Sequence, residues 1–151
     1  MTNKAVIGSS IDIDASPAEV WKVVSDLRRM GEWSPQCAKM FVLGGGVKKG
    51  TRTINVNKEG NMVWPTAAKV VEFDVDRKIA FRVVNRSIWS YELEPTATGT
   101  KLTEQRLTPD GVLGFSNTMT KRAYGSIEAF ENRLERGIGK TLARIKSEVE
   151  A

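Results

Sequence analysis

The chain has 151 residues, of which 40% are hydrophobic and 27% charged, and its formal net charge is +5. These values are typical of one globular domain that is long enough to bury a hydrophobic core. The basic residues are spread along the sequence rather than gathered in a block, so we expect no nucleic-acid partner.

Histidine is absent and cysteine occurs once, as Cys37. The lack of histidine excludes Ser-His and Cys-His nucleophile pairs and most transition-metal sites, so we expect neither a metal nor another cofactor. A lone cysteine forms no internal disulfide, and residues 1–4 open no apolar signal segment, which together indicate a cytoplasmic location. No apolar run approaches the ~20 residues that cross a bilayer, so no integral membrane contact is expected.

A strand followed directly by a capped helix opens the sequence. Over residues 7–13, the alternating positions hold Ile7, Ser9, Ile11 and Ile13, which is the period-two pattern of a half-buried strand. Ser16 is a candidate N-cap and Pro17 occupies the first helical position, which together predict a helix over 17–26. A second short helical turn is expected over 27–33.

The central part of the sequence has the pattern of short strands joined by turns. Separators rich in glycine, asparagine and aspartate divide it into short runs of strand-forming residues. Consecutive strands with short connections imply an antiparallel meander. The predicted strands are 37–43, 50–57, 62–74, 78–84, 88–94 and 100–107.

From Phe115 onward the apolar residues recur at three- and four-residue spacings, which predicts one amphipathic helix of about 35 residues. Its charged face includes Glu131. Gly125, Gly137 and Gly139 are each unfavourable inside a helix by ~1 kcal/mol relative to alanine. We therefore expect them to mark a bend, a close backbone approach or space for a ligand.

The order of one strand, two short helices, six strands and a long helix is that of the helix-grip fold. Ser-Pro-Ala-Glu-Val-Trp at 16–21 and Glu-Trp-Ser-Pro at 32–35 resemble the opening of the polyketide cyclase/dehydrase and lipid transport family. This family belongs to the START-like (SRPBCC) superfamily. Trp-Ser-Tyr-Glu-Leu-Glu-Pro at 89–95 and Gly-Thr-Lys-Leu-Thr-Glu at 99–104 resemble its last two strands.

The resemblance implies an α+β, START/Bet v 1-like domain over 1–151, with a curved seven-stranded antiparallel sheet around the C-terminal helix. It also implies an apolar tunnel between sheet and helix. Members of the family bind lipids, sterols, polyketides or other hydrophobic molecules, and a minority catalyse cyclisation, dehydration or hydrolysis. The residues that choose a ligand vary between members, so the motifs indicate fold more sharply than function.

The candidate ligand-binding residues are apolar and aromatic side chains expected to face this tunnel, although plain core packing would also explain them. Strand 78–84 is ambiguous, because its apolar alternation turns Phe81 one way, whereas a two-residue loop at Asn85-Arg86 would turn Arg82 inward. The candidates are Trp33, Trp64, Phe81, Trp89, Tyr91, Leu102, Met119, Tyr124 and Ile127.

Four side chains are candidates for acid–base chemistry: Glu104, Tyr124, Arg82 and Arg106. Glu104 and Arg106 share a strand face with Leu102, so they point inward if that leucine does. A buried charge must be paired or its pKa shifts, and the simplest alternative is that Glu104 and Arg106 pair with each other. Tyr124 offers a hydroxyl to the tunnel or only anchors the helix.

The sequence therefore predicts a protein that binds a small hydrophobic molecule of lipid, polyketide or aromatic type in an internal cavity. The alternative is a cofactor-free polyketide cyclase or dehydratase, in which Glu104 or Tyr124 acts as acid or base and Arg82 or Arg106 stabilises an enolate. A third possibility is an interaction protein whose cavity is filled by its own side chains. The expected partner is the small ligand, and the chain is expected to be a monomer or homodimer.

Overall fold

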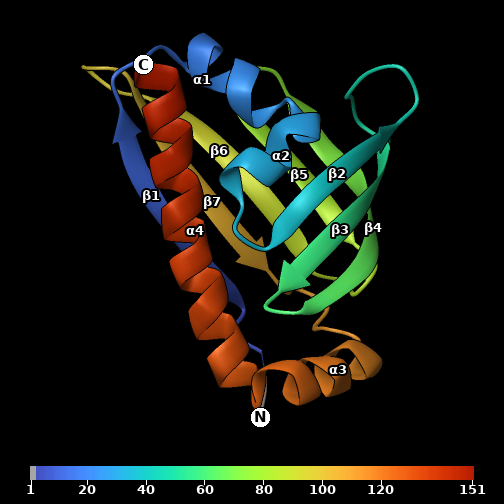
Figure 1. Cartoon of the computed structure of the whole chain (residues 1–151). Coiled ribbons are helices and arrows are strands. Elements are labelled where there is room, and N and C mark those ends of the chain that lie inside the picture. The colour runs from blue at the N-terminus through green and yellow to red at the C-terminus, as the bar shows by residue number, and fades with distance from the viewer. Residues whose placement is uncertain (1–2) are drawn as a thin grey trace.

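The computed structural model describes residues 3–151, so the first two residues of the expected domain lie outside the described residues. Figure 1 shows the elements in chain order. They are β1 (Val6–Ile13), α1 (Pro17–Val24), the 3-10 turn η1 (Leu27–Arg29), α2 (Met30–Trp33), β2 (Cys37–Leu43), β3 (Arg52–Glu59), β4 (Met62–Asp74), β5 (Lys78–Val83), β6 (Ile88–Pro95), β7 (Thr100–Leu107), α3 (Gly114–Tyr124) and α4 (Ile127–Glu150).

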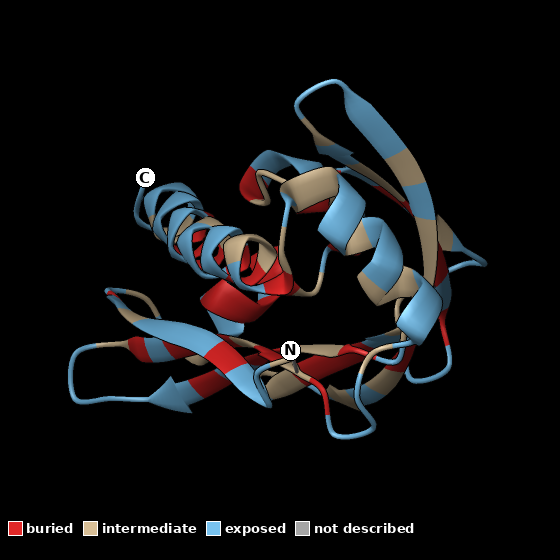
Figure 2. Cartoon of the chain, turned by 90° about the horizontal axis from the view of Figure 1, so that it is seen from below, coloured by how far each residue is buried: buried red, intermediate tan, exposed pale blue. Residues whose placement is uncertain are grey.

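All seven strands form one antiparallel sheet in the order β1-β7-β6-β5-β4-β3-β2. Seen from below in Figure 2, the sheet bends around α4 and the short helices, and buried residues gather on the surfaces that face each other. In Figure 1, α4 lies beside β1 and β7, α2 lies beside β2, and α1 lies near the C-terminal end of α4. The helix-grip fold and its two short helices after the first strand are therefore confirmed.

Helix α1 begins where the sequence predicts, for the expected physical reasons. The backbone N–H of Glu19 donates to Ser16 Oγ at 3.3 Å, and Pro17 occupies the first turn, where its missing N–H is not needed. On the buried face of the helix, Trp21 meets Phe73 of β4 edge to face, with 5.3 Å between ring centroids. This contact attaches the helix to the concave side of the sheet.

The single C-terminal helix expected from Phe115 is wrong, because the chain breaks at Gly125. This glycine has φ +88°, a left-handed conformation that ends α3. Ser126 then caps α4 by accepting a hydrogen bond of 3.0 Å from the N–H of Ala129. Helix α4 has 24 residues, a length of about 36 Å, whereas α3 buries none of its residues. Gly125 is thus the expected bend.

The two remaining helix glycines differ from each other. A Cβ at Gly137 would lie 3.3 Å from Cγ of Pro35, so this glycine marks a close approach of α4 to the segment after α2. A Cβ at Gly139 would meet no atom within 4 Å, so neither packing nor a bend requires this glycine.

The hairpin between β5 and β6 resolves the ambiguity of strand 78–84. Phe81 pairs with Trp89, and Arg82 pairs with Ile88. The two-residue loop is wrong, because residues 84–86 form a three-residue loop in which Arg86 adopts φ +77°. This register turns Phe81 toward the concave side and Arg82 toward the outer side of the sheet.

Candidate functional site

A cavity of about 140 Å³ lies between the concave face of the sheet and helices α2 and α4. The volume matches that of an internal cavity of about 150 Å³ that admits benzene. A shallower depression of about 360 Å³ runs along residues 143–151, but all its walls come from the C-terminal end of α4. We place the candidate site in the cavity because six strands and two helices contribute to its walls.

Four of the predicted ligand-binding residues line this cavity: Trp64, Phe81, Trp89 and Tyr91. They come from three successive strands, β4, β5 and β6, whose inward faces are adjacent. Leu134 of α4 closes the cavity from the helix side together with Phe130. The result is a mainly aromatic wall, suited to a flat apolar molecule.

The other five predicted ligand-binding residues do not line the cavity. Leu102 and Ile127 are buried in the protein interior away from it. Met119 lies on α3 with 51% of its surface exposed. Tyr124 ends α3 and packs on Phe130 with 4.8 Å between ring centroids.

Trp33, the fifth, is a packing residue between α2 and α4. The Arg29 guanidinium lies 4.7 Å from the centre of its ring, and its backbone carbonyl accepts a hydrogen bond of 3.2 Å from Arg144 of α4. Its position in the core agrees with the alternative that aromatic residues of this sequence serve packing alone.

Glu104 of β7 is the one candidate catalytic residue that lines the cavity. It lies opposite Tyr91 of β6 and is only 4% exposed, and its buried Oε1 has no hydrogen-bond partner among the described residues. Burial raises the pKa of this carboxyl to about 8, although the neighbouring Tyr91 hydroxyl lowers it in part. At neutral pH the group is therefore mainly protonated and uncharged.

Weakly polar groups, namely a phenol hydroxyl, a thioether and a thiol, line the cavity together with Glu104. The Tyr91 hydroxyl donates to Met30 Sδ at 3.7 Å, and burial raises the pKa of this phenol well above its ordinary value. Cys37 also lines the cavity, and burial raises the pKa of its thiol to about 11. The thiol is thus protonated and unreactive at neutral pH, as expected for a small buried residue.

A second part of the cavity wall is polar, and the sequence analysis missed it. Asn55 and Asn57 of β3 point inward, and their Nδ2 atoms donate to Thr66 Oγ1 at 3.2 Å and 3.0 Å. Ile54, which precedes Asn55, is 40% exposed on the outer face. Strand β3 thus has amides on its inner face, while its outer face carries Ile54 and Val56 between the charged Arg52 and Lys58.

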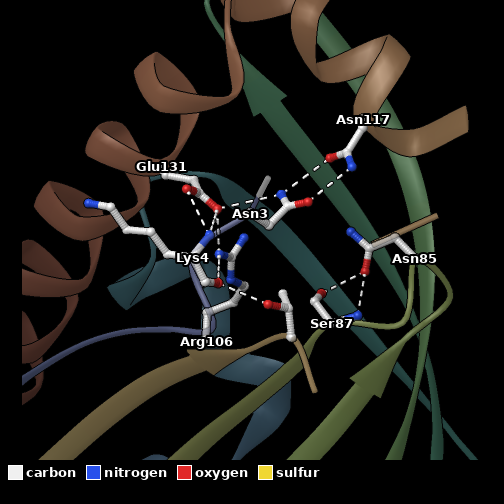
Figure 3. Close-up of polar contacts among 8 residues, drawn as sticks. Asn3, Lys4, Asn85, Ser87, Arg106, Asn117 and Glu131 are labelled. Atoms are coloured by element: carbon white, nitrogen blue, oxygen red, sulfur yellow. Dashed lines mark hydrogen bonds and ion pairs between the residues drawn. The ribbon is translucent and has the colours of Figure 1, made fainter. Parts of the chain in front are cut away.

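The predicted pairing of Glu104 with Arg106 is wrong. Arg106 instead donates from Nη2 to Glu131 Oε2 of α4 at 2.7 Å, and both side chains are 3% exposed (Figure 3). Glu131 also accepts from the backbone N–H of Lys4 at 3.1 Å. The expected place of Glu131 on the charged helix face is therefore wrong as well, and this ion pair leaves Glu104 without a charged partner.

Arg82 and Tyr124 are also outside the cavity. Arg82 lies on the outer face and pairs with Asp110 at 3.3 Å. Burial raises the pKa of Tyr124, whose hydroxyl oxygen has no partner among the described residues. The four-residue acid–base set expected from the sequence is consequently not assembled, since Glu104 alone of the four reaches the cavity.

The end of the cavity near α3 is held by amide contacts. Asn3 and Asn117 of α3 exchange two hydrogen bonds, of 3.2 Å and 3.0 Å (Figure 3). The N–H of Leu113 donates to the carbonyl of Asn85 at 3.1 Å, and the Asn85 side chain accepts from Ser87 Oγ at 2.6 Å. Asn85 and Ser87 line the cavity, so these contacts attach α3 beside it.

Residues 3–151 contain neither a cluster of metal-ligand side chains nor a helix suited to cross a membrane. In that range no three histidine, cysteine or acidic side chains gather as metal ligands would. No helix in the same range is both long and apolar enough to cross a membrane.

Comparison with known proteins gives one family and many similar folds. A family model described as polyketide cyclase / dehydrase and lipid transport matches residues 4–150. No curated protein matches the chain. A solved Polyketide_cyc-like protein from Corynebacterium glutamicum is 27% identical, with 99% of this chain and 94% of that chain covered and a TM-score of 0.67.

Two further solved structures share the fold at lower identity. The KanY protein is 21% identical, with 100% of this chain and 99% of that chain covered and a TM-score of 0.71. The Zhui aromatase/cyclase from Streptomyces sp. R1128 is 16% identical, with 96% and 93% covered and a TM-score of 0.72.

Proposed function

This chain belongs to the polyketide cyclase / dehydrase and lipid transport family, and we propose that it binds a small hydrophobic molecule in the cavity between the sheet and α4. The observation that carries the proposal is that the buried Oε1 of Glu104 has no hydrogen-bond partner within residues 3–151, in a cavity lined by five aromatic side chains. A buried polar atom without a partner costs about 1–3 kcal/mol, which a ligand that donates a hydrogen bond would recover.

The size of the cavity favours the aromatic class of ligand over a long lipid chain. About 140 Å³ holds one six-membered ring. Burying ~150 Å² of apolar ligand surface contributes roughly 4 kcal/mol before the costs of association, which corresponds to dissociation constants of about a millimolar or weaker. A phenol-like molecule fits both requirements, because its ring would pack on Trp64 and Trp89 while its hydroxyl donates to Glu104.

The test compares phenol with toluene, which has nearly the same size but no hydrogen-bond donor. Trp64 and Trp89 line the cavity, so tryptophan fluorescence and calorimetry report binding directly. We expect phenol to bind about tenfold more tightly than toluene, and E104M to abolish this preference while toluene binding remains. E92Q, a change of an exposed carboxyl on the neighbouring strand β6, is the matched control and keeps the preference.

The two possible failures are distinguishable. If neither phenol, toluene nor a panel of fatty acids and flavonoids changes the fluorescence or the melting temperature, the binding function is wrong. If toluene and phenol bind equally well in both wild type and E104M, the cavity binds ligands but Glu104 does not select them.

A second candidate function is acid–base catalysis of a cyclase or dehydratase type, which the raised pKa of Glu104 favours. A carboxyl with a pKa of about 8 is well matched to donate or accept a proton near neutral pH. The arginine expected to stabilise an enolate has no counterpart in this cavity, since Arg106 is engaged by Glu131. The Nδ2 groups of Asn55 and Asn57 are the nearest substitutes by chemistry.

This candidate is tested by incubating the protein with a short β-polyketone and following loss of water by mass spectrometry. Turnover that E104Q abolishes, and that E92Q leaves intact, supports catalysis by Glu104. Turnover that E104Q leaves unchanged excludes Glu104 as the acid or base.

A further inference from the structure

The outer face of β2, β3 and β4 carries an exposed apolar cluster. Phe41 and Leu43 of β2 are 45% and 50% exposed, and Val63 of β4 is 67% exposed. Phe41 lies opposite Ile54, which with Val56 forms the outward row of β3. These five residues are here called the apolar centre. They face away from the cavity, because Met40, Asn55 and Trp64 at alternate positions of the same three strands line it.

Basic side chains surround the apolar centre on the same face. Lys39 is opposite Val56 and its Nζ lies 4.9 Å from the centre of the Phe41 ring. Lys58 is opposite Val63, and Arg52 lies between Leu43 and Lys69 in register. None of these four basic residues forms an ion pair with another residue within 3–151. We call them, with the apolar centre, the outer patch.

The net charge of the chain is concentrated here, because acidic residues are scarce in this segment while basic residues are spread along the whole chain. Residues 38–71 contain six basic residues and one acidic residue, Glu59, so their net charge is +5. The rest of the chain has 17 basic and 17 acidic residues and sums to zero. Glu59 pairs with Arg133 of α4 and, by alternation along β3, shares the inward face with Asn57. All charged residues at the outward positions of β2, β3 and β4 over 39–69 are therefore basic.

The chemistry of the outer patch selects among possible occupants. A second copy of the chain, joined by a twofold axis, would bring the same cations against each other, which is unfavourable. The phosphates of a nucleic acid would bind the cations, but its bases would gain little from aliphatic side chains. Base stacking needs aromatic side chains, and Phe41 is the one aromatic residue of the patch. An anionic bilayer offers phosphates to the cations and an apolar layer beneath them, which matches the patch.

We propose that the outer patch attaches this protein reversibly to an anionic lipid surface. Lys39 and Lys58 contact lipid phosphates, while Phe41, Ile54 and Val63 enter the boundary between headgroups and acyl chains. The cavity is on the other face of the same strands, so attachment leaves it unobstructed and does not depend on the ligand.

The experiment is co-sedimentation with vesicles of phosphatidylcholine, alone or mixed equally with phosphatidylglycerol. We expect binding to the mixed vesicles only, weakened by added salt. K39Q/K58Q should weaken binding about tenfold or more, since each basic residue near an anionic surface contributes roughly fivefold. The matched control K101Q/K140Q removes two exposed lysines from β7 and α4 and should bind within about twofold of the wild type.

A second variant tests the apolar centre at constant charge. F41S/I54T should also weaken binding to mixed vesicles, with circular dichroism and phenol binding as checks that fold and cavity remain intact. Three results would overturn the proposal: no binding to mixed vesicles, equal loss in K101Q/K140Q, or wild-type binding by F41S/I54T. Tighter binding to a short DNA duplex than to mixed vesicles, insensitive to F41S/I54T, would assign the patch to nucleic acid instead.

Discussion

Arg106 of β7 and Glu131 of α4 form an ion pair of 2.7 Å in which each side chain is 3% exposed. The same carboxylate accepts from the backbone N–H of Lys4, and Arg106 also donates to the Lys4 carbonyl at 3.2 Å. The pair thus joins the start of the chain, the last strand and the long helix. Burying two charges is costly in free energy, and these additional hydrogen bonds offset part of that cost.

Removing one member of this pair should be far more harmful than removing both. In R106M the carboxylate of Glu131 remains buried without its cation, so we expect the free energy of unfolding to fall by about 3–5 kcal/mol. R106M/E131L replaces both charges by apolar groups and should recover most of the loss. Urea unfolding at neutral pH measures both. A single variant as stable as the double variant would contradict this account.

The stability of the protein should depend on pH through Glu104. Its pKa is about 8 in the folded state and 4.5 in the reference state, so between these values the folded protein binds more protons than the unfolded chain. The stability contributed by Glu104 is therefore complete below about pH 4.5 and is lost as the pH rises toward 8. The facing Tyr91 and Cys37 stay protonated over this range because burial raises their pKa values.

The variant E104Q removes this dependence. From pH 5 to pH 8 we expect the free energy of unfolding of E104Q, relative to wild type, to rise by up to about 4 kcal/mol. Urea unfolding at the two pH values provides the measurement, with E92Q as the exposed control. A constant difference between wild type and E104Q across this range would show that Glu104 titrates normally.

The two helix glycines should respond oppositely to alanine. Gly125 has φ +88°, so G125A adds a Cβ in a strained conformation and should reduce stability by about 1 kcal/mol. Gly139 is inside α4 with open space around its Cβ position, so G139A should increase stability by a similar amount. Thermal unfolding separates the two. Equal shifts in the same direction would contradict the bend at Gly125.

The reaction rate of the Cys37 thiol measures how accessible the cavity is. Because burial raises its pKa to about 11 and the side chain lines the cavity, we expect slow reaction with an aromatic disulfide reagent in the folded protein. Unfolding in urea should restore rapid reaction. Phenol bound in the cavity should slow the folded-state reaction further, and an unchanged rate at saturating phenol would place phenol elsewhere.

The features that sequence predicts well are those with local causes. Ser16 and Pro17 define the start of α1, and alternation and turn residues place all seven strands within a few residues of their observed bounds. In β6, alternation places Trp89 and Tyr91 on one face, and both line the cavity. In β5 alternation alone leaves the inward face open, and the register of the hairpin decides it.

The features that sequence predicts poorly depend on pairing between distant segments. The partner of Arg106 is Glu131, 25 residues away, and helical spacing alone assigns that glutamate to the exposed face. Alternation in β3 groups Asn55 with Asn57, yet cannot tell which face is inward. The break at Gly125 turns α3 away from the stripe of α4, which removes Met119 from the cavity.

The cavity of this protein depends on the alignment of β3 with its neighbours, because the two faces of this strand carry different side chains. Sliding β3 by a single residue would exchange its two faces, bringing Ile54 and Val56 inside and Asn55 out. The same slip would also bring Arg52 and Lys58 inside, and burying two unpaired cations is costly. These two basic residues therefore favour the native alignment, so replacing both by apolar residues is the change by which the cavity would be lost most readily.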